Sequence, residues 1–301
     1  MLCLLYYPVS IFNIPLDEQN GDKMYFKIQK LDKIYEAKIM PKEGLLTLLS
    51  DFGLSDVYVG VMKGVIAQIN PTLSVVDLTH QIPRQNIAAG RFCLMSAYGY
   101  FPDGTVHVAV VDPGVGGKRR AIALQLAKGF LVGPDNGLFS GILSQSPAIT
   151  AVELTNPDYW RVATPSTTFH GRDIFAPVGA HIAGGVPLKQ LGREIDPATL
   201  VELAIGEYIQ TDSGVTGCIQ YCDRFGNLVT NIPGSLVQNK TWAVKIGDKT
   251  ILGHQTYSDI PIGNLVALIG SHDWLEIAVN GGNAQMNLQI DVGAKVQLSV
   301  L

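Results

Sequence analysis

The sequence predicts an α/β protein in which a domain built on a parallel sheet precedes a smaller, β-rich domain. Short apolar runs alternate with helical patterns between Leu45 and Asp112, which is typical of parallel crossover units. Beyond about Leu203, short alternating runs are broken by Gly, Asn and Pro, which is an all-β pattern. The 301 residues are 47% hydrophobic and only 16% charged, so the chain can bury two cores of ordinary size.

The first elements follow from the spacing of apolar residues. LLTLLSD, residues 45–51, is mostly apolar, as expected for a strand covered on both faces. In residues 58–69 the apolar side chains recur at helical spacing, and Asn70-Pro71 supplies a stop, which predicts a helix. The expected elements that follow are a buried strand over 74–80, a helix over 87–101 ended by Pro102, and a strand over 105–112.

The β-rich region supplies the remaining strands and sets the domain boundary. The runs expected to form strands are GVTGCIQYCD, TWAVKIGD, NLVALIG, WLEIAVN and AKVQLSVL. The pattern changes within 198–208, so we expect an α/β domain over 44–202 and a β-rich domain over 203–301. Residues 1–43 lack a clean period and are expected to be an amino-terminal extension of unknown role.

The apolar run Met1–Phe12 is expected to be neither a signal peptide nor a membrane span. No Lys or Arg precedes it, and the first basic residue is Lys23. Its length of about a dozen residues is also less than the roughly 20 that a bilayer-spanning helix needs. Because regular patterning begins well after this run, translation from Met24 or Met40 is an alternative start.

The charge balance limits the classes of partner. A formal net charge of -4 gives no basic field of the kind that attracts nucleic acid or an anionic membrane surface. We therefore expect no nucleic-acid partner and no membrane partner. A cationic small molecule fits this balance.

The cysteines indicate a reducing compartment. Cys3, Cys93, Cys218 and Cys222 lack the paired spacings of a disulfide framework or a zinc site, so we expect a cytoplasmic protein without a metal. Cys218 and Cys222 fall in an expected strand about 13 Å apart, too far to share one ion. They are expected to be packing residues.

Three acidic residues stand where apolar strand runs end, namely Asp51, Asp77 and Asp112. The carboxyl ends of strands line the ligand crevice of open α/β sheets, so acids there converge on one place. Each can also cap a helix or a turn, as Asp commonly does. We expect a functional role for Asp51 and Asp112 and a capping role for Asp77.

VVDPGVGGKRR, residues 110–120, is the densest cluster of glycines and basic residues. Glycines after a strand end let the backbone turn sharply and approach a ligand. Their spacing fits neither a dinucleotide fingerprint nor a P-loop, and no Ser or Thr follows Lys118. Lys118 and Arg120 are expected to be solvated residues of a tight turn.

TFHGRDIFAPV, residues 168–178, places His170 beside a glycine where a loop meets a helical start. A histidine there is well placed to exchange a proton, although a structural histidine is about as common. Asp173 is expected to pair with Arg172.

Two clusters lie in the β-rich region. CDRFGNLVTNI, residues 222–232, offers Phe225 to stack on a base and Asn227 to face a purine edge, although a hairpin turn explains the same residues. GSHDWLEIAVNGG, residues 270–282, puts Ser271 and His272 in a loop. Its strand carries Glu276, which either accepts from an exocyclic amine or faces water.

Together these motifs resemble the S-adenosylmethionine (SAM) hydroxide adenosyltransferases, relatives of the fluorinase and chlorinase enzymes. The resemblance covers Leu45–Leu301 and rests on SDFGLSDVYVGVMKGVI, INPTLSVVDLTHQI, GTVHVAVVDPGVGGKRR, PDNGL, TFHGRDIFAPV, DRFGN and GSHDWLEIAVN, in that order. It implies an α/β domain joined to a smaller β-barrel-like domain. It also implies a homotrimer whose site lies between one subunit's first domain and a neighbour's second.

The resemblance further implies the reaction and the roles of single residues. SAM is the substrate, with no cofactor, and water attacks the ribose C5′ to give adenosine and methionine. Asp112, Arg119 and His170 match the trio that holds this water, and either His170 or Asp112 takes its proton. The other matching positions are Asp51 for the ribose, Asp56, Asp223 and Ser271 for the methionine part, and Asn227, Glu276 and the backbone near Val279 for adenine.

Two other functions are alternatives. The halogenating relatives carry a Tyr and a Thr around the halide where this chain has Asp112 and Val115, and a carboxylate repels a halide by like charge. A non-catalytic SAM-binding or sensing protein would keep Asp51 and Asn227 but could lose the water-holding trio, and this chain retains all three residues. The resemblance therefore favours water as the nucleophile. It leaves the preferred sulfonium epimer open.

Overall fold

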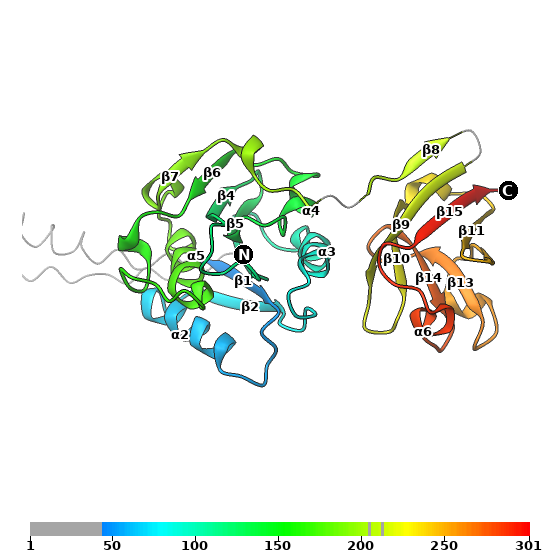
Figure 1. Cartoon of the computed structure of the whole chain (residues 1–301), viewed down its shortest axis with the longest axis horizontal. Coiled ribbons are helices and arrows are strands. Elements are labelled where there is room, and N and C mark those ends of the chain that lie inside the picture. The colour runs from blue at the N-terminus through cyan, green and yellow to red at the C-terminus, as the bar shows by residue number, and fades with distance from the viewer. Residues whose placement is uncertain (1–43, 204–205, 212–213) are drawn as a thin grey trace, which may run out of the picture. The chain divides into compact units, whose positions relative to one another are not determined.

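The computed structural model describes residues 44–203, 206–211 and 214–301, which are organised around two sheets (Figure 1). The expected extension, residues 1–43, lies outside the described residues. The first sheet has seven strands and is accompanied by helices, whereas the second has eight strands. This order confirms the predicted sequence of an α/β region followed by a β-rich region.

The first sheet is mixed, with the strand order β2-β1-β3-β5-β4-β6-β7. Its strands are β1 (Leu45–Ser50), β2 (Ser74–Thr79), β3 (Thr105–Val110), β4 (Ala121–Gln125), β5 (Gly129–Pro134), β6 (Thr150–Glu153) and β7 (Arg193–Ile195). The pairs β1–β2, β1–β3 and β3–β5 are parallel, as predicted. The pairs β4–β5, β4–β6 and β6–β7 are antiparallel, so the prediction of a parallel sheet holds for only one half.

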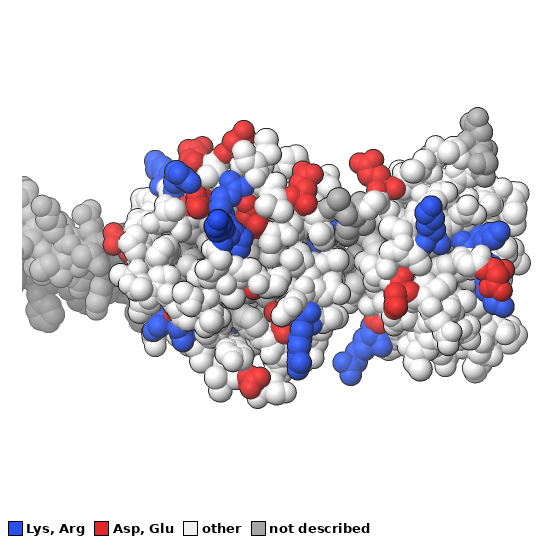
Figure 2. All heavy atoms as spheres, in the orientation of Figure 1, with Lys and Arg blue, Asp and Glu red and all other residues white. Residues whose placement is uncertain are grey.

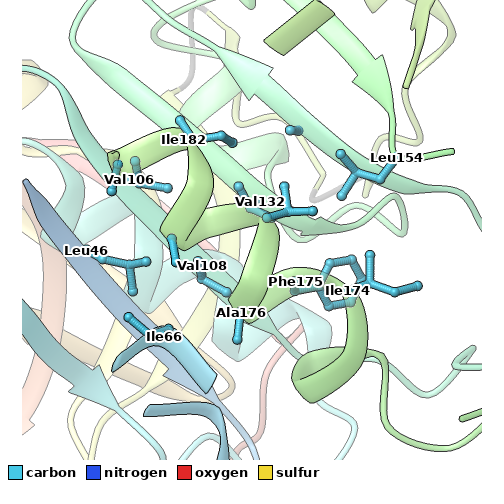
Figure 3. Packing of buried hydrophobic residues seen from close by; sticks show 14 of the residues in the cluster. Leu46, Ile66, Val106, Val108, Val132, Leu154, Ile174, Phe175, Ala176 and Ile182 are labelled. Atoms are coloured by element: carbon cyan, nitrogen blue, oxygen red, sulfur yellow. The ribbon is translucent and has the colours of Figure 1, made fainter. Parts of the chain in front are cut away.

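Helices cover both faces of this sheet. They are α2 (Tyr58–Ile69), α3 (Ile87–Tyr98), α4 (Ser140–Leu143) and α5 (Ala176–Ala183). Successive residues of a strand point to opposite faces, and β1 shows this directly. Leu46 and Leu48 belong to the core under α2 and α5, whereas Leu49 belongs to the core under α3 and α4. Figure 3 shows the first of these cores, in which Phe175 is fully buried.

Two predictions about these elements need correction. The strand β2 was expected to be buried, yet several of its side chains are exposed because it is the edge strand and pairs only with β1. The second helix was expected to reach Phe101, but α3 ends at Tyr98. Gly99, with an ordinary helical φ of -69°, is its C-cap, so the helix ends before Pro102.

The second sheet is antiparallel and nearly closes into a barrel. Its order is β12-β11-β15-β9-β10-β14-β13, with β8 paired to β9. A bridge between Gly253 and Ala267 links the end of β12 to β13, the two ends of that order. The elements are β8 (Ile209–Thr211), β9 (Gly214–Cys222), β10 (Leu228–Pro233), β11 (Trp242–Ile246), β12 (Lys249–Leu252), β13 (Leu265–Ile269), β14 (Trp274–Val279), α6 (Ala284–Leu288) and β15 (Lys295–Val300). This confirms a barrel-like β region.

Short turns of helix complete the chain. They are the 3₁₀ turns Pro157–Tyr159, Leu188–Gln190, Pro197–Thr199, Gly234–Val237 and Tyr257–Asp259, and a π-helical turn at Gly171–Phe175. The last strand of the first sheet ends at Ile195 and the first strand of the second begins at Ile209. The domain limits 44–202 and 203–301 remain a prediction.

Packing joins α3 to the second sheet. Phe92 of α3 stacks on Tyr221 of β9, with ring centroids 4.5 Å apart and planes at 18°. The Sγ of Cys93 lies 3.4 Å from the hydroxyl of the same tyrosine. Cys222 is likewise half-buried and donates to Gln285, so these two cysteines pack against neighbours, as predicted for Cys222.

The visible surface carries charges of both signs. Figure 2 shows Lys and Arg interspersed with Asp and Glu on the visible face of the described residues. None of the helices in the described part of the chain is long and apolar enough to cross a membrane. Across the same residues, no group of three or more His, Cys, Asp and Glu side chains is arranged to hold a metal ion.

Candidate functional site

A cavity of about 320 Å³ lies at the carboxyl ends of the parallel strands β1 and β3. This edge is where open α/β sheets bind ligands. Its walls come from residues 51–52 after β1, from four residues at the end of β3 and just beyond it, and from residues 168–171 at the start of the π-helical turn. The four are Val110, Asp112, Pro113 and Val115. Arg84 and Gln85 complete the lining. The cavity therefore contains Asp51, Asp112 and His170, three residues predicted from the sequence.

Asp112 and Arg119 form a bidentate ion pair at the wall of this cavity. The Nε of Arg119 donates to Asp112 Oδ1 at 3.0 Å, and its Nη2 donates to Oδ2 at 2.5 Å. The side chain of Asp112 is only 5% exposed, and that of Arg119 is 11% exposed. A planar guanidinium that meets a carboxylate through two parallel hydrogen bonds fixes the carboxylate in one orientation.

His170 joins this pair through the same guanidinium. Its Nδ1 lies 2.7 Å from Arg119 Nη2. Because a guanidinium only donates, Nδ1 is the acceptor and the ring proton of the neutral imidazole sits on Nε2. Burial, followed by the charge of Arg119, lowers the pKa of His170, against the opposing effects of Asp112 and Asp173. His170 is therefore neutral at pH 7.

Glycine allows the two loops that carry this trio to approach each other. Gly116 has a φ of +74°, and a Cβ there would overlap the carbonyl oxygen of Thr167. The loop after β3 therefore lies directly against the loop that leads to His170. This close approach explains a glycine of VVDPGVGGKRR without invoking a phosphate.

Three other charged residues of the two motifs, Arg120, Arg172 and Asp173, form ion pairs away from the trio. Asp173 is fully buried and accepts from Arg172 and Arg161, as predicted for Arg172. Burial disfavours ionisation of Asp173, but the hydrogen bonds from these arginines hold its pKa far below the usual value. Arg120 was expected to be solvated, yet it pairs with Asp135 and donates to Thr199. Its side chain instead ties the loop after β3 to the segment that follows β7.

Asp51 lies in the cavity with one oxygen already engaged. Its Oδ2 accepts the backbone N–H of Gln85 at 2.7 Å, and Gln85 has a φ of +61°. Sequence reasoning missed this contact, since a backbone donor leaves no side-chain signal. Val115 lines the same cavity, as its match to the halide region implied. Asp56 is exposed and is not among the lining residues.

Asp223, Phe225 and Asn227 lie together in the turn between β9 and β10. Asp223 Oδ1 accepts the backbone N–H groups of Phe225 and Asn227, and its Oδ2 accepts the Asn227 amide at 3.0 Å. The hairpin-turn interpretation of Asp223 is therefore correct in geometry. The ring of Phe225 is 75% exposed, which leaves an aromatic face open on an otherwise ordered turn.

Ser271, Glu276 and Val279 belong to β14 and the loop before it. Ser271 is exposed and lines a different cavity, of about 780 Å³. Glu276 does not face water: it is 4% exposed, Tyr257 donates to its Oε1 at 2.7 Å, and His272 Nε2 lies 3.2 Å from Oε2. The side chain of Val279 is buried in the core of the second sheet.

The predicted residues thus fall into separate groups. One group, Asp51, Asp112, Arg119 and His170, surrounds the cavity beside the first sheet. The others lie on the turn 223–227 and on β14. Within the described residues, the lining of the cavity includes no residue of the second sheet.

The cavity has a buried acid paired with an arginine, and a neutral histidine, at the carboxyl ends of parallel strands, which is where α/β proteins bind ligands. The chain belongs to the SAM hydroxide adenosyltransferase family. The model of that family's N-terminal domain matches residues 46–192, and the model of its C-terminal domain matches residues 217–297.

Individual relatives agree with this assignment. The (R)-S-adenosyl-L-methionine hydrolase of Salinispora arenicola is 38% identical over 255 residues, which cover 84% of this chain and 97% of the relative. The structure of an uncharacterised conserved protein from Thermotoga maritima superposes with a TM-score of 0.79 at 34% identity, covering 84% of this chain and 99% of the other. A fluorinase from an Actinoplanes strain is 26% identical over 297 residues, covering 86% and 99%.

Proposed function

We propose that this chain hydrolyses SAM to adenosine and methionine by in-line attack of water on the ribose C5′. The observation that carries the proposal is the carboxylate of Asp112, fixed by Arg119 at the wall of the cavity. The sulfonium leaves as a neutral thioether, so the reaction needs no general acid. The protein has to orient one water molecule about 3 to 3.5 Å from the carbon and to make it more nucleophilic.

The hydrogen bonds favour Asp112 over His170 as the group that accepts from the water. The Nδ1 lone pair of His170 is taken by Arg119, and its other nitrogen carries the ring proton. A neutral Nε2–H donates and cannot take a proton. The carboxylate of Asp112 still has lone pairs beyond its two bonds to the guanidinium. In this scheme Asp112 accepts from the water and His170 orients it.

Charge supports the same reaction. Attack by a hydroxide-like water on a cationic sulfonium substrate reduces charge, and opposite charges attract more strongly in a dry site than in bulk water. The arginine balances the carboxylate before the substrate arrives.

A halogenase is the alternative enzyme, and the geometry of Asp112 disfavours it. A halide at this wall would approach a buried carboxylate whose Arg119 partner is already engaged bidentately. Placing two like charges at short range costs several kcal/mol of binding free energy. We therefore expect chloride or fluoride to bind weakly beside this carboxylate. The halogenating relatives are also more distant than the hydrolase relatives.

The rest of SAM is assigned by matching positions. We propose that Asp51 holds the ribose, that Asp56, Asp223 and Ser271 hold the methionine part, and that Asn227, Glu276 and the backbone of Val279 hold adenine, with Phe225 stacked on the base. Supporting observations are the exposed ring of Phe225 and the location of Asp51 in the cavity. No cofactor is part of the scheme.

A homotrimer is part of the proposal. The residues around the first-sheet cavity and those on the 223–227 turn and β14 are assigned to one SAM molecule, and a neighbouring subunit can bring the second group to the cavity. In this scheme the first-sheet cavity of one subunit faces the 223–227 turn of its neighbour. The support is that, among the described residues, only the first-sheet part of the chain lines the cavity. The substrate epimer follows the relatives named for the R form, so we propose activity on (R)-SAM.

A single assay separates the candidate functions. The purified protein is incubated with each sulfonium epimer of SAM, with and without chloride or fluoride, and the products are identified. Hydrolysis gives adenosine and methionine in equal amounts at a rate independent of halide. In labelled water, solvent oxygen must appear in the 5′-hydroxyl of adenosine, and label at any other position excludes attack at C5′. A halogenated nucleoside or no product at all would overturn the proposal.

A further inference from the structure

A chain of polar side chains starts at Ser50, the residue before Asp51, and runs from two buried groups to an exposed ion pair between Asp77 and Lys63. Ser50, the last residue of β1, is 1% exposed, and its Oγ lies 2.7 Å from His80 Nδ1. His80, just after β2, is 4% exposed, and its Nε2 lies 3.1 Å from Asp77 Oδ1. Lys63 of α2 donates to the other oxygen of Asp77 at 2.7 Å. The prediction that Asp77 caps a turn is therefore wrong: its carboxylate contacts His80 and Lys63 at the end of this series of polar side chains.

The hydrogen bonds have one consistent direction. The backbone N–H of Phe52 donates to Ser50 Oγ at 3.3 Å, which leaves the hydroxyl proton to point at His80 Nδ1. The ring proton then sits on Nε2 and faces Asp77. Although His80 Nε2 lies 3.1 Å from Asp77 Oδ1, it is buried without a hydrogen bond of good geometry, so this contact is weaker than the one to Ser50.

The same residues hold both loops around Asp51. The backbone N–H of Gly53 donates to the carbonyl of His80 at 2.8 Å, which joins the loop after β1 to the loop after β2. A few residues on, the N–H of Gln85 donates to the carboxylate of Asp51. His80 therefore contacts the residue before Asp51 through its ring and the segment after Asp51 through its backbone.

A second hydroxyl–imidazole pair in the same sheet provides a comparison. Thr47 and His107 form a similar hydroxyl–imidazole pair in the same sheet, at 2.8 Å, but both lie among buried side chains and neither lines the cavity. The Ser50–His80 pair, by contrast, is next to the one carboxylate that faces the cavity from β1. The buried hydrogen bond between Ser50 Oγ and His80 Nδ1 restricts the local geometry at the end of β1.

We propose that His80, anchored by Asp77, is a positioning residue that orients Asp51 toward the ribose hydroxyls. This inference rests on the ribose-binding role proposed for Asp51. His80 touches no substrate in this scheme, and its effect passes through Ser50 and the 51–53 backbone. Loss of the imidazole lets the carboxylate turn away, so the ribose hydroxyls contribute less to binding while the adenine contacts remain.

The test compares the binding of adenosine with that of 2′,3′-dideoxyadenosine, measured by calorimetry. The two ligands differ only in the ribose hydroxyls, so the ratio of their dissociation constants measures what these hydroxyls contribute to binding. Effects on the base contacts or on the stability of the protein change both constants alike. We expect the intact protein to favour adenosine by about tenfold or more, since hydrogen bonds to a charged group are among the stronger ones. Asp51→Asn and His80→Phe should each bring the ratio below about threefold.

Two variants make this test specific. His80→Asn can still accept from Ser50 at the Nδ1 position, so it should retain clearly more of the ratio than His80→Phe. His107→Phe removes the matched buried imidazole and should lower the melting temperature while leaving the ratio unchanged. The proposal is overturned if His80→Phe keeps the ratio, if His80→Asn loses as much as His80→Phe, or if His107→Phe lowers it equally.

The outcome is separable from the proposed function. A protein that hydrolyses SAM and discriminates the two nucleosides, but whose His80→Phe variant still discriminates, contradicts only the role of His80. A protein that discriminates through His80 but releases no adenosine from SAM contradicts only the proposed hydrolysis. A double variant, Asp51→Asn with His80→Phe, should behave like Asp51→Asn alone, because both changes act on one interaction.

Discussion

The bidentate pair between Asp112 and Arg119 decides the chemistry available at the cavity. It holds the carboxylate in one orientation before any ligand binds. We expect Asp112→Asn to lower kcat by about 100-fold or more and to change KM by less than about threefold, since in the proposed mechanism the carboxylate acts on the water rather than on SAM. Steady-state kinetics check this. Asp158→Asn, a change at an exposed acid, is the control, and near-normal turnover of Asp112→Asn would remove the carboxylate from the mechanism.

If His170 acts as proposed, its protonation determines where activity falls on the acid side of the pH profile. Burial and Arg119 lower its pKa below 6.5, so the neutral ring that accepts from Arg119 persists as pH falls through the usual histidine range. We expect kcat/KM to show no loss near pH 6.5 and to decline only at lower pH, where protonated His170 would face Arg119 as a like charge. His170→Asn keeps an acceptor for Arg119 and should retain more activity than His170→Phe. An inflection near 6.5 that disappears in His170→Asn would contradict this assignment.

His107 makes stability depend on pH without touching the cavity. Burial lowers its pKa to about 4 from 6.5. The neutral ring is favoured in the folded state, so its stabilisation is complete above pH 6.5 and is lost as pH falls toward 4. The loss is on the order of 3 kcal/mol in the free energy of unfolding. Urea unfolding should show a flatter profile over this range for His107→Gln than for the intact protein, with His254→Gln as the control.

At the scale of elements, the loop after β3 depends on its glycine. Gly116→Ala places a Cβ in a left-handed conformation and against Thr167, which should cost about 1 to 3 kcal/mol and move Arg119 relative to His170. We expect both a lower melting temperature and a lower kcat. Gly99→Ala is the matched control, because Gly99 has an ordinary helical φ and open space around its Cα. Unchanged kinetics in Gly116→Ala would show that the two loops tolerate separation.

The same elements show what pattern alone can predict. Helix α2 and the parallel strands β1 and β3 were predictable, because the spacing of their apolar residues reflects which of their faces are buried in the core. The antiparallel strands β4 and β6 were not, since a strand buried on both faces looks the same whether its neighbour is parallel or antiparallel. The exposure of β2 likewise follows from its location at the edge of the sheet. The order of strands cannot be read from the local pattern of apolar residues.

The site was predictable residue by residue only in part. Asp51 and Asp112 follow from their location at strand ends, a rule of the fold class. His170 lies 51 residues beyond Arg119, and no local spacing links them; the family resemblance did. The N–H of Gln85 and the imidazole of His80 gave no signal, because their importance arises from contacts made only after the sheet forms.

For the whole molecule, the proposed trimer predicts that one site uses two chains. Asp112→Asn disables the first-sheet cavity, and Phe225→Ala removes the exposed ring on the other half. If each site combines the cavity of one subunit with the 223–227 turn of a neighbour, mixed trimers regain intact sites from two defective chains.

We expect subunits of these two variants, co-expressed in equal amounts, to recover about a quarter of normal activity at low SAM, since intact halves meet at random. Each variant alone should stay well below this value. The measurement is adenosine release from purified trimers whose subunit ratio is checked by mass spectrometry. If both halves of the site instead belonged to one chain, no mixture could contain an intact site, and activity would equal the average of the separate variants. That result, obtained with a confirmed mixed trimer, would place the whole reaction within a single subunit.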